Sequence, residues 1–182
     1  VTDFEAHALW MEPAVNLYCV AAEETKARLI ARGVKESAVV VSGIPIAGKF
    51  SRPVDTLRVR KDLCLTSQQN VVLVLGGGMG MGPVAELLTE LNRVPRPLQV
   101  VVVCGRNETL RAELLGKPWQ HPTQVLGFVT NMQELMAVAA VVVTKPGGLT
   151  ASEALAMGRP LFIISPIPGQ EAANSDFLLE RG

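Results

Sequence analysis

Short aliphatic runs alternate along the chain with segments that have helical periodicity. The runs are nearly continuous in Val, Ile and Leu, which is typical of strands that are buried on both faces of a parallel sheet. They cover residues 17–21, 39–42, 71–75, 98–103, 124–129, 141–144 and 161–164. Because strands alternate with helices, the pattern predicts an α/β fold with a doubly wound, mostly parallel sheet.

The intervening segments carry the spacing and the end signals of helices. From Val84 to Leu91, apolar residues recur at i, i+3, i+4 and i+7, which is one helical face. Other predicted helices cover residues 25–33, 131–139, 150–157 and 171–181. Thr150 followed by Glu153 is a capping-box pattern, and it predicts that the fourth of these helices begins at Thr150.

Residues 1–16 do not follow this repeat. We expect them to be a connector or the tail of a missing N-terminal domain. We expect residues 17–182 to form one α/β domain, truncated at its C-terminus.

Composition removes several classes of protein. The chain has 182 residues, 17 Lys plus Arg and 17 Asp plus Glu, so no overall charge favours nucleic acid as a partner. The three Cys are far apart and only two His are present, which argues against a disulfide framework or a zinc site. No apolar run approaches the ~18 residues of a membrane span, and we expect no signal peptide.

Five glycines stand between Gly76 and Gly82, after the third run and before a helix. In a doubly wound sheet this is the carboxyl end of a strand, where ligands bind. Free N–H groups and the helix dipole there favour an anion, and missing Cβ atoms let a phosphate approach the backbone. The loop does not fit a dinucleotide fingerprint, because Pro83 occupies the third glycine position and no acidic residue follows the next strand.

Two further strand ends carry polar groups that a nucleotide sugar would use. After the sixth run, Glu153 is either a capping-box residue or a carboxylate that accepts from a pair of ribose hydroxyls. After the last run, an amide and carboxylate cluster suits sugar hydroxyls, which both donate and accept. This cluster comprises Gln170, Glu171 and Asn174. Together with a phosphate cradle, these groups predict a nucleotide-sugar site.

Five motifs occur in an order and spacing that resemble a known family. They are GGGMGMGPV, VCGRN, GFVTNM, TKPGGLTASEA and PIPGQEAAN. The chain resembles the C-terminal, donor-binding half of glycosyltransferase family 28 enzymes of GT-B fold. VTDFEAH, CVAAEE and VSGIPI are similar to the branch of monogalactosyldiacylglycerol synthases and processive diacylglycerol glucosyltransferases.

The resemblance implies roles for individual residues. The diphosphate would lie against the glycine loop, the uracil largely against backbone groups of Phe128 and Val129, the ribose on Glu153, and the hexose on the amide and carboxylate cluster. Lys145 is either a phosphate neighbour or a solvated charge. The substrate-binding residues implied are Gly77, Gly78, Met79, Gly80, Gly105, Arg106, Phe128, Val129, Lys145, Gly148, Thr150, Glu153, Gln170, Glu171 and Asn174.

The chain departs from the family pattern at one position. Where the family often has Arg in G-x-P-x-R, this chain has Ala47, and Lys49 is a candidate replacement. The catalytic base is expected on the missing acceptor domain. His7 is a weak candidate for it, against packing or hydrogen bonding in a linker. No metal and no cofactor are expected, since the UDP-sugar is a co-substrate.

The implied function is transfer of a hexose from UDP-glucose or UDP-galactose to a lipid acceptor, for which diacylglycerol is the expectation. Residues 17–182 would be the nucleotide-sugar-binding domain of a cytoplasmic enzyme, peripheral on the inner face of the membrane. This chain by itself is expected to lack transferase activity. The alternatives are a UDP-sugar 2-epimerase-like enzyme and a non-catalytic nucleotide-binding module. The sequence leaves glucose against galactose, processivity and oligomeric state open.

Overall fold

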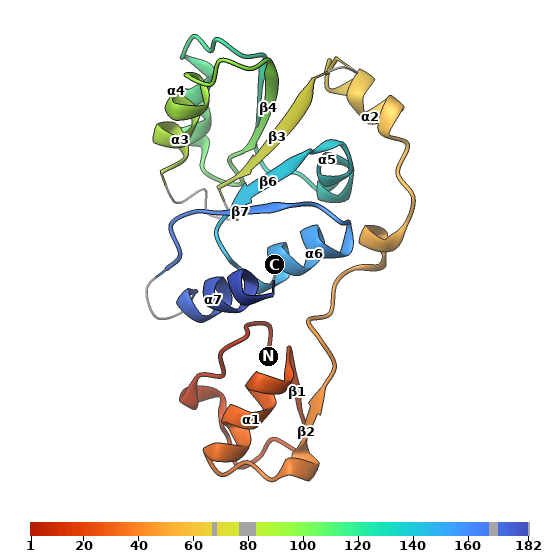
Figure 1. Cartoon of the computed structure of the whole chain (residues 1–182), viewed down its shortest axis with the longest axis vertical. Coiled ribbons are helices and arrows are strands. Elements are labelled where there is room, and N and C mark those ends of the chain that lie inside the picture. Colours follow the sequence, from red (N-terminus) through yellow and green to blue (C-terminus); the bar gives the residue numbers. More distant parts are fainter. Residues whose placement is uncertain (67–68, 77–82, 168–170, 182) are drawn as a thin grey trace. The chain divides into compact units, whose positions relative to one another are not determined.

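The computed structural model describes residues 1–66, 69–76, 83–167 and 171–181, and the chain falls into two compact units (Figure 1). The small unit comprises Val1–Ala47, Pro146–Ser152 and Pro166–Gly182. The sheet unit comprises Gly48–Lys145 and Glu153–Ser165. Each unit is described by itself below.

The sheet unit is built on five parallel strands. They are β3 (Asn70–Leu75), β4 (Leu98–Val103), β5 (Thr123–Leu126), β6 (Val141–Thr144) and β7 (Leu161–Ile163), in the order β5-β4-β3-β6-β7. All six residues of β4 are buried, as a near-continuous aliphatic run predicts for a strand covered on both faces. The predicted α/β class with a doubly wound parallel sheet is confirmed.

Helices cover both faces of this sheet. They are α2 (Thr56–Asp62), α3 (Val84–Leu91), α4 (Glu108–Leu115) and α5 (Met132–Val138), preceded by the 3₁₀ segment η3 (Gly48–Ser51). Helices α3 and α4 lie on one face and α5 with α2 on the other (Figure 1). The core on the first face joins Val74 and Val102 to Leu88 and Leu114, all of them buried. Alternate residues of each strand therefore serve the two helix layers.

The strand order reverses between β3 and β6, which are neighbours although β4 and β5 lie between them in sequence. Val74 of β3 pairs with Val102 on one side and with Val143 of β6 on the other. In open α/β sheets, such a reversal opens a crevice at the carboxyl ends of the two strands. The segments after β3 and β6, including the glycine loop, begin at this point.

The small unit contains a two-stranded parallel sheet. Its elements are η1 (Ala8–Trp10), β1 (Tyr18–Val20), α1 (Glu23–Ala31), η2 (Glu36–Ala38), β2 (Val39–Val41) and α7 (Ala172–Glu180). Ala6, Tyr18 and Leu29 belong to its buried core.

Residues 1–16 pack within the small unit. The ring of Phe4 stacks on Phe177 with 3.9 Å between ring centroids, and the Thr25 hydroxyl donates to the Phe4 carbonyl at 2.8 Å. Residues 1–16 therefore belong to the same compact unit as residues 17–47, and their role as a connector or as the tail of a preceding domain stays a prediction.

Helix α6 (Gly148–Ala156) contributes its first residues to the small unit and the rest to the sheet unit. It begins two residues before Thr150, so the predicted capping box at Thr150 is wrong. Ala151 N–H already donates to the Gly147 carbonyl at 2.9 Å, as an intrahelical bond does. In the described ranges, no helix is long and apolar enough to cross a membrane.

Candidate functional site

Most of the glycine loop and part of the fifth motif, PIPGQEAAN, lie outside the described residues. The predicted phosphate-binding residues Gly77, Gly78, Met79 and Gly80 lie outside the described residues, as does Gln170. The structure describes Gly76, whose N–H donates to the Val103 carbonyl at 3.1 Å and so extends the ladder between β3 and β4 by one bond. The loop thus starts directly at the carboxyl edge of the sheet.

The ends of β4 and β5 bring two predicted residues together. Gly105 is buried and has φ +60°, a left-handed conformation that costs an L-residue with a Cβ about 1–2 kcal/mol. It turns the chain so that the Arg106 guanidinium lies over the Phe128 ring, 5.4 Å from its centroid. Phe128 is 63% exposed. A flat apolar ring with a cation beside it is therefore presented at the sheet edge.

Cys104, at the end of β4, is fully buried and is not a nucleophile. Burial raises the pKa of its thiol, and Glu108 adds to that effect, while the Arg111 guanidinium opposes it. The thiolate is the reactive form of cysteine. Cys104 therefore stays a neutral core residue at physiological pH.

Glu153 is half-buried on α6. Burial raises the pKa of its carboxyl, and the nearby Lys49 ammonium partly offsets this. Because α6 begins at Gly148, Glu153 is not at a capping position. Within the described part of the chain its carboxylate has no hydrogen bond, so its acceptor oxygens are available to a ligand.

Lys49 lies in η3 and is half-buried. Its Nζ donates to the Thr130 carbonyl at 2.7 Å, in the loop that follows β5. Sequence spacing gives no hint of this contact, because the two residues are 81 positions apart. Val129 in the same loop is half-buried.

Lys145 follows β6 and is half-buried, with no ion pair among the residues that the structure describes. Both interpretations of its ammonium, a phosphate neighbour or a solvated charge, remain predictions.

Of the predicted residues in the small unit, Asn174 disagrees most clearly with its expected role. It is fully buried. Its Oδ1 accepts from Phe4 N–H at 2.8 Å, and its Nδ2 donates to Asp3 Oδ1 at 2.9 Å and to the Pro146 carbonyl at 3.0 Å. Both amide hydrogens are thus used within the protein. Asn174 holds three segments of the small unit together, and it is not presented to a hexose.

Gly148, Thr150 and Glu171 also belong to the small unit. A Cβ on Gly148 would overlap the Thr2 carbonyl oxygen and stand 3.1 Å from Ile44 Cδ1. Close backbone approach therefore requires this glycine, whatever its relation to a ligand. Thr150 is half-buried, and Glu171 Oε2 accepts from Ile167 N–H at 2.9 Å.

His7 caps the short helix η1. Its Nδ1 accepts from Leu9 N–H at 3.2 Å, which leaves the proton of a neutral ring on Nε2. The placement favours the packing and linker interpretation over the catalytic one.

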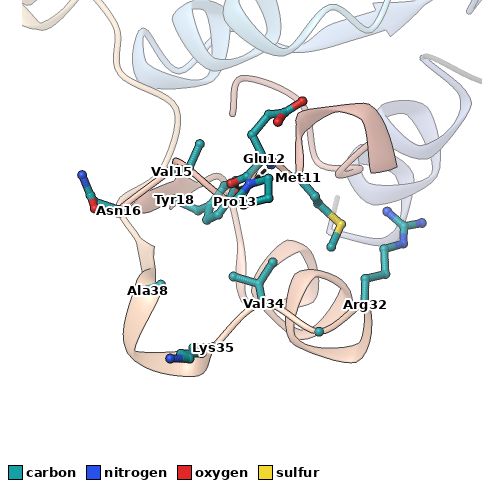
Figure 2. A pocket seen from close by; sticks show the side chains of 11 residues that line it. Met11, Glu12, Pro13, Val15, Asn16, Tyr18, Arg32, Val34, Lys35 and Ala38 are labelled. Atoms are coloured by element: carbon teal, nitrogen blue, oxygen red, sulfur yellow. Dashed lines mark hydrogen bonds between the residues drawn. The ribbon is translucent and has the colours of Figure 1, made fainter.

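A pocket of about 530 Å³ lies in the small unit beside Tyr18 and the end of α1 (Figure 2). Arg32 and Val34 line it, and the Tyr18 hydroxyl exchanges hydrogen bonds with the backbone of Glu12. None of the residues predicted to bind substrate lines this pocket. In the described part of the chain, His, Cys, Asp and Glu side chains form no group of three that could hold a metal ion.

Two family models match the chain. Residues 1–46 match monogalactosyldiacylglycerol (MGDG) synthase, and residues 71–176 match the glycosyltransferase family 28 C-terminal domain. The second range contains the five strands of the sheet unit except Asn70, the first residue of β3.

Curated relatives carry the same name in several bacilli. Processive diacylglycerol beta-glucosyltransferases from Bacillus cereus (strain AH187) and Bacillus pumilus (strain SAFR-032) are 37% and 36% identical over 185 and 184 residues. The alignments cover 100% of this chain and 47% and 48% of the relatives. The chain therefore spans about half the length of the curated relatives it matches.

Solved structures share the fold at low identity. MurG from Acinetobacter baumannii has a TM-score of 0.59 and 22% identity, with 92% of this chain and 50% of that chain covered. Anabaena Alr3699/HepE in complex with UDP has a TM-score of 0.56 and 19% identity, with 91% and 54% covered. The same protein in complex with UDP-glucose has a TM-score of 0.53 and 18% identity, again with 91% and 54% covered. The family 28 match extends over more than half of the chain, and the chain belongs to glycosyltransferase family 28.

Proposed function

We propose that the chain is the donor-binding half of a glycosyltransferase that moves a hexose from a UDP-sugar to a lipid acceptor, diacylglycerol. The observation that carries the proposal is the carboxylate of Glu153, which has no hydrogen bond within the described residues and lies on α6, the helix that follows β6. Membership of glycosyltransferase family 28 indicates the class of reaction, and the names of the Bacillus relatives indicate diacylglycerol as the acceptor.

Glu153 would accept hydrogen bonds from the two ribose hydroxyls of UDP. An ionised carboxylate only accepts, whereas a protonated one keeps a donor that a diol must accommodate. Since burial raises the Glu153 pKa, UDP affinity should fall as pH drops through that raised value. Loss would begin at a higher pH than an ordinary glutamate would give.

The exposed Phe128 ring and the loop around it would hold the uracil, largely through backbone groups. The Arg106 guanidinium lies over the ring and adds a positive charge at the same edge of the sheet. Gly77, Gly78, Met79 and Gly80 would cradle the diphosphate with backbone N–H groups, as the glycine-rich sequence predicts. Such preorganised donors stabilise the charge that collects on the leaving UDP in the transition state, so we expect no metal and no cofactor.

The acceptor lipid and the catalytic base would be held by the other half of the enzyme, which the curated relatives have the length to contain. We expect the whole protein to act at the cytoplasmic face of a membrane. Whether the donor is UDP-glucose or UDP-galactose is decided by the contacts to the hexose 4-hydroxyl, for which Glu171 is the described candidate.

A ligand panel tests the proposal on the 182-residue chain. UDP, UDP-glucose, UDP-galactose and NAD are each added at a hundred times the Kd measured for UDP, and the melting temperature is recorded. Binding at that ratio stabilises by about 2.7 kcal/mol, or roughly 5–10 °C in Tm for a chain of this size. We expect a rise with the three uridine nucleotides and none with NAD. A rise with NAD alone would overturn the proposal.

A further inference from the structure

The segment before the main sheet braces the loop that follows β5. Phe50 of η3 is buried, and it anchors the neighbouring Lys49 on the sheet unit. From there the Lys49 ammonium reaches the Thr130 carbonyl at 2.7 Å. This bond is charge-assisted, and such bonds are stronger than those between neutral groups.

A second contact joins the same two regions. Arg58 of α2 forms an ion pair with Glu134 at the start of α5. Glu134 Oε2 in turn accepts from Asn131 Nδ2 at 2.7 Å, and this bond with Asn131 is the main cause that lowers the Glu134 pKa. The loop from Gly127 to Asn131 is therefore fixed at its end by Lys49 and by the Arg58–Glu134 pair.

Lys49 also acts on the carboxylate that we assign to the ribose. Its positive charge lowers the pKa of Glu153, against the effect of burial. Within the described residues, Lys49 is the charged group that acts on this carboxyl. A single ammonium therefore serves both sides of the site: the loop that carries Phe128 and the helix that carries Glu153.

We propose that Lys49 is a positioning residue of the donor site, which holds the loop after β5 and compensates the charge of Glu153, and that it does not bind the donor's phosphates. The assignment rests on the function proposed above. It differs from the sequence-based hypothesis, in which Lys49 replaces a family Arg beside the phosphates. The geometry supports the new role because the ammonium already donates to the Thr130 carbonyl at 2.7 Å.

A series of ligands with different numbers of phosphates separates the two roles. Uridine, UMP and UDP are titrated by NMR into the wild-type chain, Lys49→Met and Lys49→Arg. A positioning role predicts that Lys49→Met weakens all three ligands by a similar factor, about tenfold, since each keeps the uracil and ribose. Lys49→Arg should restore affinity to within about threefold, because a guanidinium can donate to the same carbonyl and carries the same charge.

A 2′-deoxy ligand separates an effect on the ribose contact from a general loss of structure, because a general loss of structure would weaken UDP and 2′-deoxy-UDP alike. Since 2′-deoxy-UDP lacks one hydroxyl that Glu153 would accept from, the same substitution should weaken it less than it weakens UDP. A loss that is absent for uridine and grows with each phosphate would overturn the proposal in favour of a phosphate contact. Unchanged affinities in Lys49→Met would overturn it as well. A wild-type chain that binds neither uridine nor UDP would overturn both this inference and the proposed function.

Discussion

At the scale of single residues, Gly148 shows how closely two backbone segments approach in the small unit. Any side chain there would overlap the Thr2 carbonyl, and neither backbone segment can yield as the end of a flexible side chain could. Overpacking of this kind costs about 1–3 kcal/mol. We expect Gly148→Ala to lower the free energy of unfolding by that amount in urea denaturation.

Gly147→Ala is the matched control. A Cβ at this neighbouring position would stand 3.9 Å from Glu171 Oε1, which is ordinary van der Waals contact. Its effect should be about 1 kcal/mol or less. Equal free energies of unfolding for the two variants would contradict the close approach between Gly148 and the Thr2 carbonyl.

The Glu153 carboxylate should lower the stability of the protein at pH 7, although the proposed binding of UDP depends on it. A carboxyl whose folded-state pKa is raised contributes stability below its unfolded pKa and loses it as pH rises through the folded value. At pH 7 the wild type therefore carries the cost of a half-buried charge, which Glu153→Gln removes. We expect the variant to melt higher than the wild type at pH 7 and to lose that advantage below pH ~4. A lower Tm of the variant at pH 7 would instead indicate a structural role for the carboxylate.

At the scale of elements, three helices end in the same motif. Gly33 after α1 and Gly158 after α6 have positive φ, and their N–H groups bond back to the last turn as in a Schellman motif. The third case, after α2, has Cys64 with φ +53° at that position. The Cys64 N–H donates to the Lys61 carbonyl at 3.0 Å, and the Leu65 N–H donates to the Arg60 carbonyl at 2.8 Å. Cys64 therefore carries backbone strain that the two glycines avoid.

Replacing Cys64 by Gly should relieve that strain. We expect Cys64→Gly to raise the free energy of unfolding by about 0.5–1 kcal/mol in urea denaturation. Cys64→Ser, which also removes the thiol but keeps a Cβ, should stay within about 0.5 kcal/mol of the wild type. The same gain in both variants would trace the effect to the thiol and not to the backbone.

Elements with a strong aliphatic pattern could be predicted from the sequence, and elements set by local bonds could not. The predicted runs 98–103 and 141–144 coincide with β4 and β6, because a strand buried on both faces has little freedom in composition. Helix α2 was not predicted, although Asp55 caps it by accepting from Arg58 N–H at 3.0 Å. Its exposed, basic surface carries little apolar periodicity, so only that cap marks its start.

The candidate site shows the same division. The order of the motifs predicted which loops follow the strand ends, and it singled out Glu153 as a candidate site residue. This was possible because the loops at one edge of a parallel sheet follow from chain order. The bond of Lys49 to Thr130 and the burial of Asn174 could not be predicted, because both depend on tertiary packing between segments far apart in sequence. At the start of α6 the prediction was wrong, because the spacing of Thr150 and Glu153 is also compatible with positions inside a helix, and the helix already begins at Gly148.

At the scale of the whole molecule, the parallel sheet and the family membership together indicate the kind of ligand that we propose. The family 28 match, residues 71–176, covers the sheet unit from residue 71 onward, and the MGDG synthase match, residues 1–46, nearly coincides with the first segment of the small unit. The balance of 17 basic and 17 acidic residues gives the chain no long-range attraction for a polyanion. We therefore expect affinity for UDP to come from groups placed at the sheet edge, among which the described carboxylate of Glu153 has no hydrogen bond within the described residues.

The most direct test is a calorimetric titration of UDP into the wild-type chain, Glu153→Gln and the control Glu180→Gln, whose carboxylate is exposed on α7. Hydrogen bonds to a charged group contribute about 1.5–3 kcal/mol. We predict that Glu153→Gln raises the Kd for UDP by about ten- to a hundredfold, while Glu180→Gln leaves it unchanged. Equal Kd values for UDP in the wild type and Glu153→Gln would contradict the assignment of this sheet edge as the donor site.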